Sequence, residues 1–231
     1  MNDHSQMIPT KPTNPFPLGR HLHHDIRNAE HRALVSPPLR ALVANKMWNT
    51  LTTFDQGQSS RCTTESAIGT LLTMPYINNF VEKTKFDDPE ERQVAYKRWQ
   101  SFDPVEWGVH DGSASDSPFK GLRAEGIITG WRWLFGEVEV REFVTWYGPV
   151  SVGTIWTDDM FYPDQDGFIH PTGAEAGGHE YRILQYSKLR DAYRIMNSWG
   201  KSWGHWGRVW IKSEDLNSLL QQDGDAVTIS M

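Results

Sequence analysis

The chain has 231 residues, a length that suits one compact unit, and its 38% of hydrophobic residues can supply a core. The 23 lysines and arginines are outnumbered by 29 acidic residues, so the net charge of -6 gives no basic surface and we expect no nucleic-acid partner. A single cysteine excludes an intrachain disulfide, and no apolar stretch approaches the roughly 20 residues of a membrane span, so we expect a cytoplasmic protein of a reducing compartment with no membrane partner.

The first part of the sequence is predicted to be an extended arm, which we place at residues 1–50. Its first residues contain no apolar segment like that of a secretory signal peptide, so none is expected. Four prolines favour an extended chain over a helix: Pro9, Pro12, Pro15 and Pro17. The remainder, residues 51–231, is predicted to form a single domain.

Helix signals follow in residues 51–135. A helix is expected to start at Cys62, where Thr63 or Thr64 can act as the cap, and to end before Pro75. The dipeptides Asp88-Pro89 and Ser117-Pro118 each open a further helix, because proline is favoured at the first helical position. This region is therefore predicted to be a helical lobe.

The pattern changes from about residue 136. Short segments rich in β-branched and aromatic residues are separated by turn residues, as is typical of strands: VEVREFV, PVSVGTIW, EYRILQY, AYRIM, GRVWIK and AVTIS. Helices followed by strands indicate an α+β fold with two lobes, helical at about 51–135 and strand-rich at about 136–231, with a cleft between them.

The only cysteine, Cys62, lies where the first helix is expected to begin. The partial positive charge of a helix N-terminus favours a thiolate, so this position indicates an activated nucleophile that is ionised at neutral pH. Such a nucleophile needs a base, a group that orients the base, and donors for an oxyanion. The alternative is that Cys62 is a small buried apolar residue, as many unpaired cysteines are.

Two segments near the C-terminus supply the missing groups. His179 precedes a predicted strand, and Asn197 follows the next strand 18 residues later. Adjacent strands can hold the imidazole and the carboxamide side by side, so that Asn197 accepts from one ring nitrogen while the other nitrogen faces the sulfur. Trp199 could cover that hydrogen bond from water.

These segments resemble the motifs of the papain-like cysteine peptidases. The resemblance spans residues 55–211 and rests on three stretches in the family's order: Asp55-Gln56-Gly57 ahead of Cys62, Gly178-His179-Glu180-Tyr181, and Asn197-Ser198-Trp199-Gly200 followed by Ser202-Trp203-Gly204 and Gly207. The last stretch is the most specific of the three.

The resemblance implies a two-lobed fold in which the helix starting at Cys62 packs on an antiparallel, β-barrel-like lobe. It implies Cys62 as the nucleophile, His179 as the base and later the acid, Asn197 as the residue that orients the imidazole, and Gln56 as an oxyanion donor together with the Cys62 N–H. A peptide or protein substrate would then lie along four further residues: Gly112, Ser113, Gly178 and Trp199. No cofactor and no metal are implied.

The stretch before the nucleophile departs from the family pattern C-G-[SA]-C-[WY], because here it is Ser59-Ser60-Arg61-Cys62-Thr63. Arg61 is expected to bring a positive charge beside the thiol. The departures resemble divergent bacterial or phage members, and a phage-encoded chain could be virion-associated. The 61 residues before Cys62 are expected to be too few for an inhibitory prodomain, although the arm could lie across the cleft.

Several functions stay open at this point. The site could serve a peptidase, an amidase of cell-wall peptides or a transpeptidase, and a decayed site would leave a structural or binding protein. His21, His23 and His24 are not expected to bind a metal, because no cysteine or carboxylate pattern accompanies them. The oligomeric state is not predicted.

Overall fold

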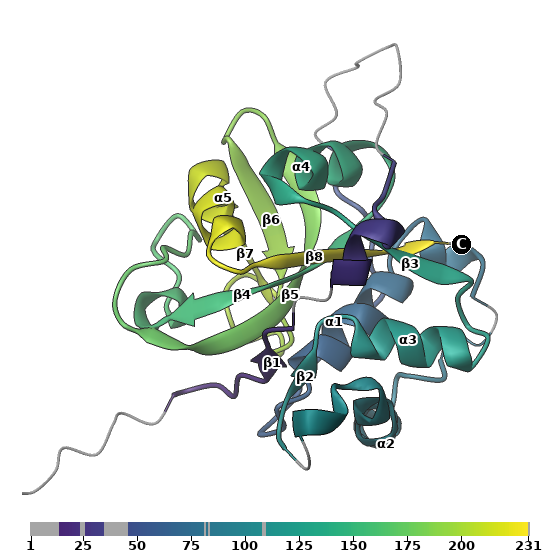
Figure 1. Ribbon diagram of the computed structural model, residues 1–231. Coiled ribbons are helices and arrows are strands. Elements are labelled where there is room, and N and C mark those ends of the chain that lie inside the picture. Colours follow the sequence, from purple (N-terminus) through teal and green to yellow (C-terminus); the bar gives the residue numbers. More distant parts are fainter. Residues whose placement is uncertain are drawn as a thin grey trace, which may run out of the picture.

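The computed structural model describes residues 14–23, 26–34, 46–80, 82, 84–107 and 110–230. It has the predicted α+β architecture, in which a group of helices lies beside an antiparallel sheet (Figure 1). The predictions for Pro9, Pro12 and His24 lie outside the described residues.

The helical lobe contains α1 (Cys62–Leu71), α2 (Pro89–Trp99) and α3 (Ser117–Ala124), joined in part by 3₁₀ turns at Tyr76–Asn78, Gln100–Phe102 and Val105–Trp107. The start of α2 follows the prediction, since the Asp88 side chain accepts a hydrogen bond from the Glu90 N–H. In contrast, α1 begins at Cys62 without a side-chain cap, and every residue of α1 is buried. The lobe is therefore assembled around α1.

The second lobe is a six-stranded antiparallel sheet in the order β3-β8-β4-β5-β6-β7. Its strands are β3 (Gly130–Trp133), β4 (Val150–Thr157), β5 (Glu175–Ser187), β6 (Ala192–Met196), β7 (Arg208–Lys212) and β8 (Asp225–Ser230). A 3₁₀ turn (Asp158–Phe161) follows β4, and α5 (Ser213–Gln221) follows β7. No pairing joins β3 to β7 within the described part of the chain, so the sheet is open and not the barrel-like lobe that the resemblance implies.

One predicted strand is wrong, because VEVREFV lies within α4 (Gly136–Trp146). Val140 and Val144 are fully buried, whereas Val138 is 54% exposed. Residues four apart share one face of a helix, so this burial pattern fits a helix and not a strand. Packing of that face on the sheet outweighs the preference of valine for strands.

Two large clusters of buried apolar residues stabilise the lobes. One core lies between the sheet, α4 and α5, and includes Val140, Tyr181 and Leu216. The other core surrounds α1, includes the fully buried Ile68, and takes in Val227 from β8. Because β8 contributes to both cores and α1 packs against β5, the start of α1 and the middle of β5 meet at the boundary of the lobes.

Part of the arm lies at this boundary. The strand β1 (Arg20–His21) pairs in parallel with β2 (Ser113–Ala114), and Figure 1 shows β1, in purple, between the sheet and the helices. The Gly19 N–H just before β1 donates to the Gly178 carbonyl of β5 at 3.2 Å. The arm therefore contacts both lobes, and it continues into a 3₁₀ turn at Ile26–His31.

Candidate active site

The thiol of Cys62 lies at the N-terminus of α1 and is fully buried. It forms no disulfide. The backbones of Gly19, Thr63 and Glu180 hydrogen-bond to the sulfur. Thr63 belongs to α1, Glu180 to β5 and Gly19 to the arm, so three segments that are distant in sequence meet at this atom.

His179 and Asn197 lie side by side, as the sequence predicts. The Nε2 atom of His179 on β5 is 2.7 Å from Oδ1 of Asn197, the residue after β6. Because a carboxamide oxygen only accepts, Nε2 is the donor of this bond. The other ring nitrogen, Nδ1, is buried and has no hydrogen-bond partner among the described residues. In the neutral ring, Nδ1 is therefore the nitrogen that can take a proton.

Aromatic rings enclose this imidazole. Trp199 stacks on His179 with the ring centroids 4.6 Å apart, and Trp156 contacts His179 edge-on at 5.0 Å. Trp199 also stacks on Phe16 of the arm, at 4.7 Å and an interplanar angle of 10°. The rings exclude water from the His179–Asn197 hydrogen bond, and this exclusion strengthens it.

Gln56 is buried in the loop before α1, and hydrogen bonds fix its carboxamide. Its oxygen accepts from Ser198 Oγ at 2.6 Å, which orients Nε2 as a donor. Nε2 donates to the Ser59 carbonyl at 2.7 Å and to the carbonyl of Pro17, in the arm, at 3.2 Å. The side chain that the resemblance implies as an oxyanion donor therefore binds a peptide carbonyl oxygen here.

Residues 16–21, which we call the arm segment, lie along the positions that the resemblance implies for a substrate. The Gly19 carbonyl accepts from the Ser113 N–H at 2.8 Å, and the Gly19 N–H donates to Gly178. Gly112, with a φ of +95°, lies against the same carbonyl. A Cβ at Gly19 would lie 1.9 Å from the Ser60 carbonyl oxygen, so a larger residue does not fit at position 19.

Burial determines the protonation of the two central groups. It raises the pKa of the Cys62 thiol to about 12, and the charge of Glu180 raises it further. Burial lowers the pKa of His179 to about 4, although the hydrogen bond to Asn197 opposes this. Both groups are therefore neutral at pH 7. The prediction of an ionised thiol is wrong for this arrangement, because desolvation outweighs the effect of the helix N-terminus.

The charge of Arg61 is directed to other partners. Its Nε lies 2.6 Å from Glu65 Oε1, and its Nη1 donates to Gln93 at 2.8 Å. Glu65 also pairs with Arg92 at 2.7 Å. The expected positive charge beside the thiol is thus paired with a buried carboxylate.

A group of polar residues beside the thiol was not predicted from the sequence. The Arg20 guanidinium, from the arm segment, lies among Ser115, Glu180 and Asp225. Arg20 and Asp225 are 205 residues apart, so no local motif links them. The only signal in the sequence is the position of Glu180 next to His179.

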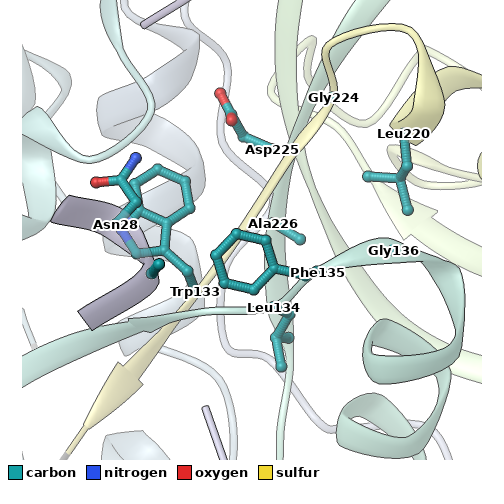
Figure 2. A pocket seen from close by; sticks show the side chains of 10 residues that line it. Asn28, Trp133, Leu134, Phe135, Gly136, Leu220, Gly224, Asp225 and Ala226 are labelled. Atoms are coloured by element: carbon teal, nitrogen blue, oxygen red, sulfur yellow. The ribbon is translucent and has the colours of Figure 1, made fainter. Parts of the chain in front are cut away.

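A pocket of about 550 Å³ is lined in part by the same Asp225 (Figure 2). Its lining also includes Trp133, Phe135 and Leu220, and none of the described residues that line it is a cysteine or a histidine. The described residues contain no group of three or more histidine, cysteine or acidic side chains placed to hold a metal. Within the same residues, no helix combines the length and the apolar character that a membrane crossing needs.

No protein-family model and no curated protein matches the sequence. Solved structures do match. Xylellain, a cysteine protease from Xylella fastidiosa, has a TM-score of 0.56 at 18% identity, over 96% of this chain and 99% of that chain. Digestive procathepsin L2 from the larval midgut of Tenebrio molitor has a TM-score of 0.61 at 17% identity, over 94% of this chain and 78% of that chain.

A second Tenebrio molitor protein, digestive procathepsin L 3, has a TM-score of 0.56 at 17% identity, over 87% of this chain and 74% of that chain. At these identities the similarity concerns the fold. The matches cover most of this chain and include both the helices and the sheet. The chain therefore has the fold of the papain-like cysteine proteases.

Proposed function

We propose that the chain is a cysteine peptidase that cleaves amide bonds of peptides or proteins through a thioester on Cys62. Two observations support this most: the 2.7 Å hydrogen bond between His179 and Asn197, and the Cys62 thiol at a helix N-terminus, whose sulfur is hydrogen-bonded by the backbone of Glu180, the residue after His179. Xylellain, whose fold this chain shares, is a cysteine protease. The same activity accounts for all four polar groups of the site: thiol, imidazole and two carboxamides.

In the first half of the proposed reaction, His179 Nδ1 takes the proton of the Cys62 thiol. The thiolate attacks the carbonyl carbon of the substrate, and the carbonyl π electrons move to the oxygen. Gln56 Nε2 donates to this oxyanion, and loss of such a donor typically lowers the rate by about 10²–10³. The C–N bond then breaks, and the imidazolium gives its proton to the leaving amine, which leaves a thioester.

In the second half, water replaces the amine. His179 Nδ1 takes a proton from this water, whose oxygen attacks the thioester carbon. Collapse of the second oxyanion releases the carboxylic acid, and the proton on His179 returns to the sulfur. Throughout both halves, Asn197 Oδ1 holds the Nε2–H and so keeps Nδ1 directed at the reacting atoms.

The proposed reaction requires that the arm segment leaves the cleft. The Pro17 carbonyl occupies Gln56 Nε2, and Gly19 lies against Ser60 and the Cys62 sulfur. When the arm segment leaves, water and substrate reach the thiol, so the burial that holds Cys62 and His179 neutral is relieved. The described arrangement is then a resting form.

A buried thiol is compatible with a second hypothesis, that the chain is a decayed, non-catalytic protein. A decayed site predicts that Asn197 is turned away from His179, whereas these residues form a 2.7 Å hydrogen bond. The residue that covers the sulfur from outside the two lobes is Gly19, in a segment held to them by backbone hydrogen bonds and by the side chains of Phe16 and Arg20. We therefore favour a covered enzyme over a decayed one.

The test is peptide hydrolysis by the full chain, measured by mass spectrometry under reducing conditions at pH 7. The protein carries Gly19→Ala, which displaces the arm segment. We expect cleavage that is abolished by adding Cys62→Ala and reduced at least about 10³-fold by adding His179→Ala. If the Gly19→Ala protein and the Gly19→Ala, Cys62→Ala protein form equal amounts of product, the proposal is overturned. Peptidoglycan fragments in parallel reactions distinguish a cell-wall amidase or transpeptidase by the products.

A further inference from the structure

The side chain of Arg20 fills a buried site next to the thiol. Its Nη2 lies 2.5 Å from Asp225 Oδ2 and donates to the Asp223 carbonyl at 2.7 Å. Its Nε is 3.4 Å from Ser115 Oγ. The side chains of Arg20 and Asp225 are only 2% and 5% exposed. The guanidinium is thus recognised by a carboxylate, a carbonyl and a hydroxyl at once.

A second acidic side chain completes this site. Ser115 Oγ donates to Glu180 Oε2 at 2.7 Å, and Ser151 Oγ donates to Glu180 Oε1 at 2.7 Å. At Gly153 on β4, a Cβ would lie 2.7 Å from both Arg20 Nε and Glu180 Oε2. The absence of a side chain at this position leaves the space that the arginine fills. We call Ser115, Gly153, Glu180 and Asp225 the acidic pocket.

The acidic pocket adjoins the groups proposed for catalysis. Glu180 follows His179 on β5, and its backbone hydrogen-bonds to the Cys62 sulfur. The residue before Arg20, Gly19, forms backbone hydrogen bonds with Ser113 on one side and Gly178 on the other. An extended peptide held by those two backbones therefore presents a neighbouring side chain to the acidic pocket.

From this geometry we infer that the acidic pocket selects the substrate of the proposed peptidase by binding an arginine side chain of that substrate. In the described structure, Arg20 of the arm segment occupies the position of the substrate arginine. The inference rests on the proposed function. The planar guanidinium matches acceptors that lie in several directions, as the point charge of lysine does not. An apolar side chain in this place would form neither the ion pair with Asp225 nor the hydrogen bond to the Asp223 carbonyl.

The test is a binding measurement that does not depend on catalysis. The full chain carries Cys62→Ala, which prevents turnover, Gly19→Ala, which displaces the arm segment, and Arg20→Ala, which removes the side chain that fills the pocket. The probes are the peptide FPLGRH, which is the sequence of residues 16–21, and its analogue with citrulline, a neutral isostere, in place of arginine. Isothermal titration calorimetry is expected to show that the arginine peptide binds about 100-fold more tightly.

A pocket variant assigns the preference to named residues. Adding Asp225→Asn is expected to bring the two affinities within about threefold of each other, and circular dichroism shows whether this variant folds. The arginine and citrulline peptides are also compared on the protein that keeps Asp225. The test therefore remains possible if the Asp225→Asn variant fails to fold. Equal affinity of the two peptides, or binding of neither, overturns the inference.

The same experiment separates the inference from the proposed function. If the chain hydrolyses no peptide but binds the arginine peptide preferentially, the proposed peptidase activity fails while the pocket stands. If the Gly19→Ala protein cleaves peptides with no preference for arginine, and calorimetry shows no preference either, the pocket assignment fails while the peptidase stands.

Discussion

Two buried clusters of carboxylates and arginines in the described part of the chain differ in the segment that supplies the arginine. In the first cluster, Glu65 on α1 pairs with Arg61, directly before α1, and with Arg92 on α2. In the second, Asp225 on β8 pairs with Arg20 of the arm segment. All five of these side chains are buried. The two clusters therefore resemble each other in chemistry but not in connectivity.

That difference in connectivity suggests different roles. The Glu65 pairs join neighbouring parts of one lobe, and they cannot separate unless that lobe unfolds. The Arg20 pair joins the sheet to the arm segment, which contacts the rest of the chain through a short strand, a few backbone hydrogen bonds and the Phe16 stack. We infer that the first cluster stabilises the fold, whereas the second can be exchanged for a substrate.

The largest expected effect concerns the first cluster. Glu65→Gln removes the charge that two buried arginines share, so we expect the free energy of unfolding to fall by about 3–5 kcal/mol. Urea denaturation measures it. The control is Glu139→Gln, whose partner Arg32 is 57% exposed, and for which we expect a loss of at most about 1 kcal/mol. Equal losses in the two variants would contradict the role assigned to Glu65.

For the second cluster we expect a smaller loss of unfolding free energy and a larger gain in the access of reagents to the Cys62 thiol. Arg20→Ala removes the ion pair of the arm segment, and water can then solvate Asp225. We expect iodoacetamide to alkylate Cys62 about 10–100-fold faster at pH 8, with a smaller loss of unfolding free energy than for Glu65→Gln. A loss of stability as large as that for Glu65→Gln, without faster alkylation, would show that Arg20 is also part of the folded core.

The smallest expected effect concerns the aromatic contact of the arm segment. Phe16→Ala removes the stack on Trp199, and aromatic pairs of this kind contribute about 0.5–1.5 kcal/mol beyond their buried area. Alkylation of Cys62 should therefore become about 2–10-fold faster. Phe102→Ala, at a partly exposed ring outside the arm, is the control and should leave the rate unchanged. An unchanged rate for Phe16→Ala would mean that the ring does not hold the arm segment in place.

Local signals in the sequence predict part of the fold and part of the candidate site. The α+β class, the start of α1 at Cys62 and the adjacency of His179 and Asn197 all follow from local signals and strand order. Residues 138–144 were predicted wrongly because β-branched side chains favour strands locally, whereas their helical form buries Val140 and Val144 against the sheet.

The arrangement around the thiol could not be predicted for another reason. The acidic pocket joins a residue from the loop before α3 with residues from three strands, and the ion pair between Asp225 and Arg20 of the arm spans 205 positions. The pKa of Cys62 is raised chiefly by burial, and a distant segment, the arm, reaches the sulfur through the Gly19 backbone. A sequence shows which side chains could react, but burial by a distant segment depends on the tertiary contacts.

The central claim is that the arm segment covers an otherwise reactive thiol. Its most direct test is the pH dependence of Cys62 alkylation, measured in the intact protein and in the full chain with Gly19→Ala. In the intact protein the thiol pKa is raised to about 12, so the rate should be low and keep rising up to pH 10. In Gly19→Ala the rate should be higher and level off near neutral pH, because the thiolate then pairs with protonated His179. Gly130→Ala is the control, because a Cβ there meets no atom closer than 3.9 Å. Identical pH profiles for the intact protein and Gly19→Ala would contradict the account.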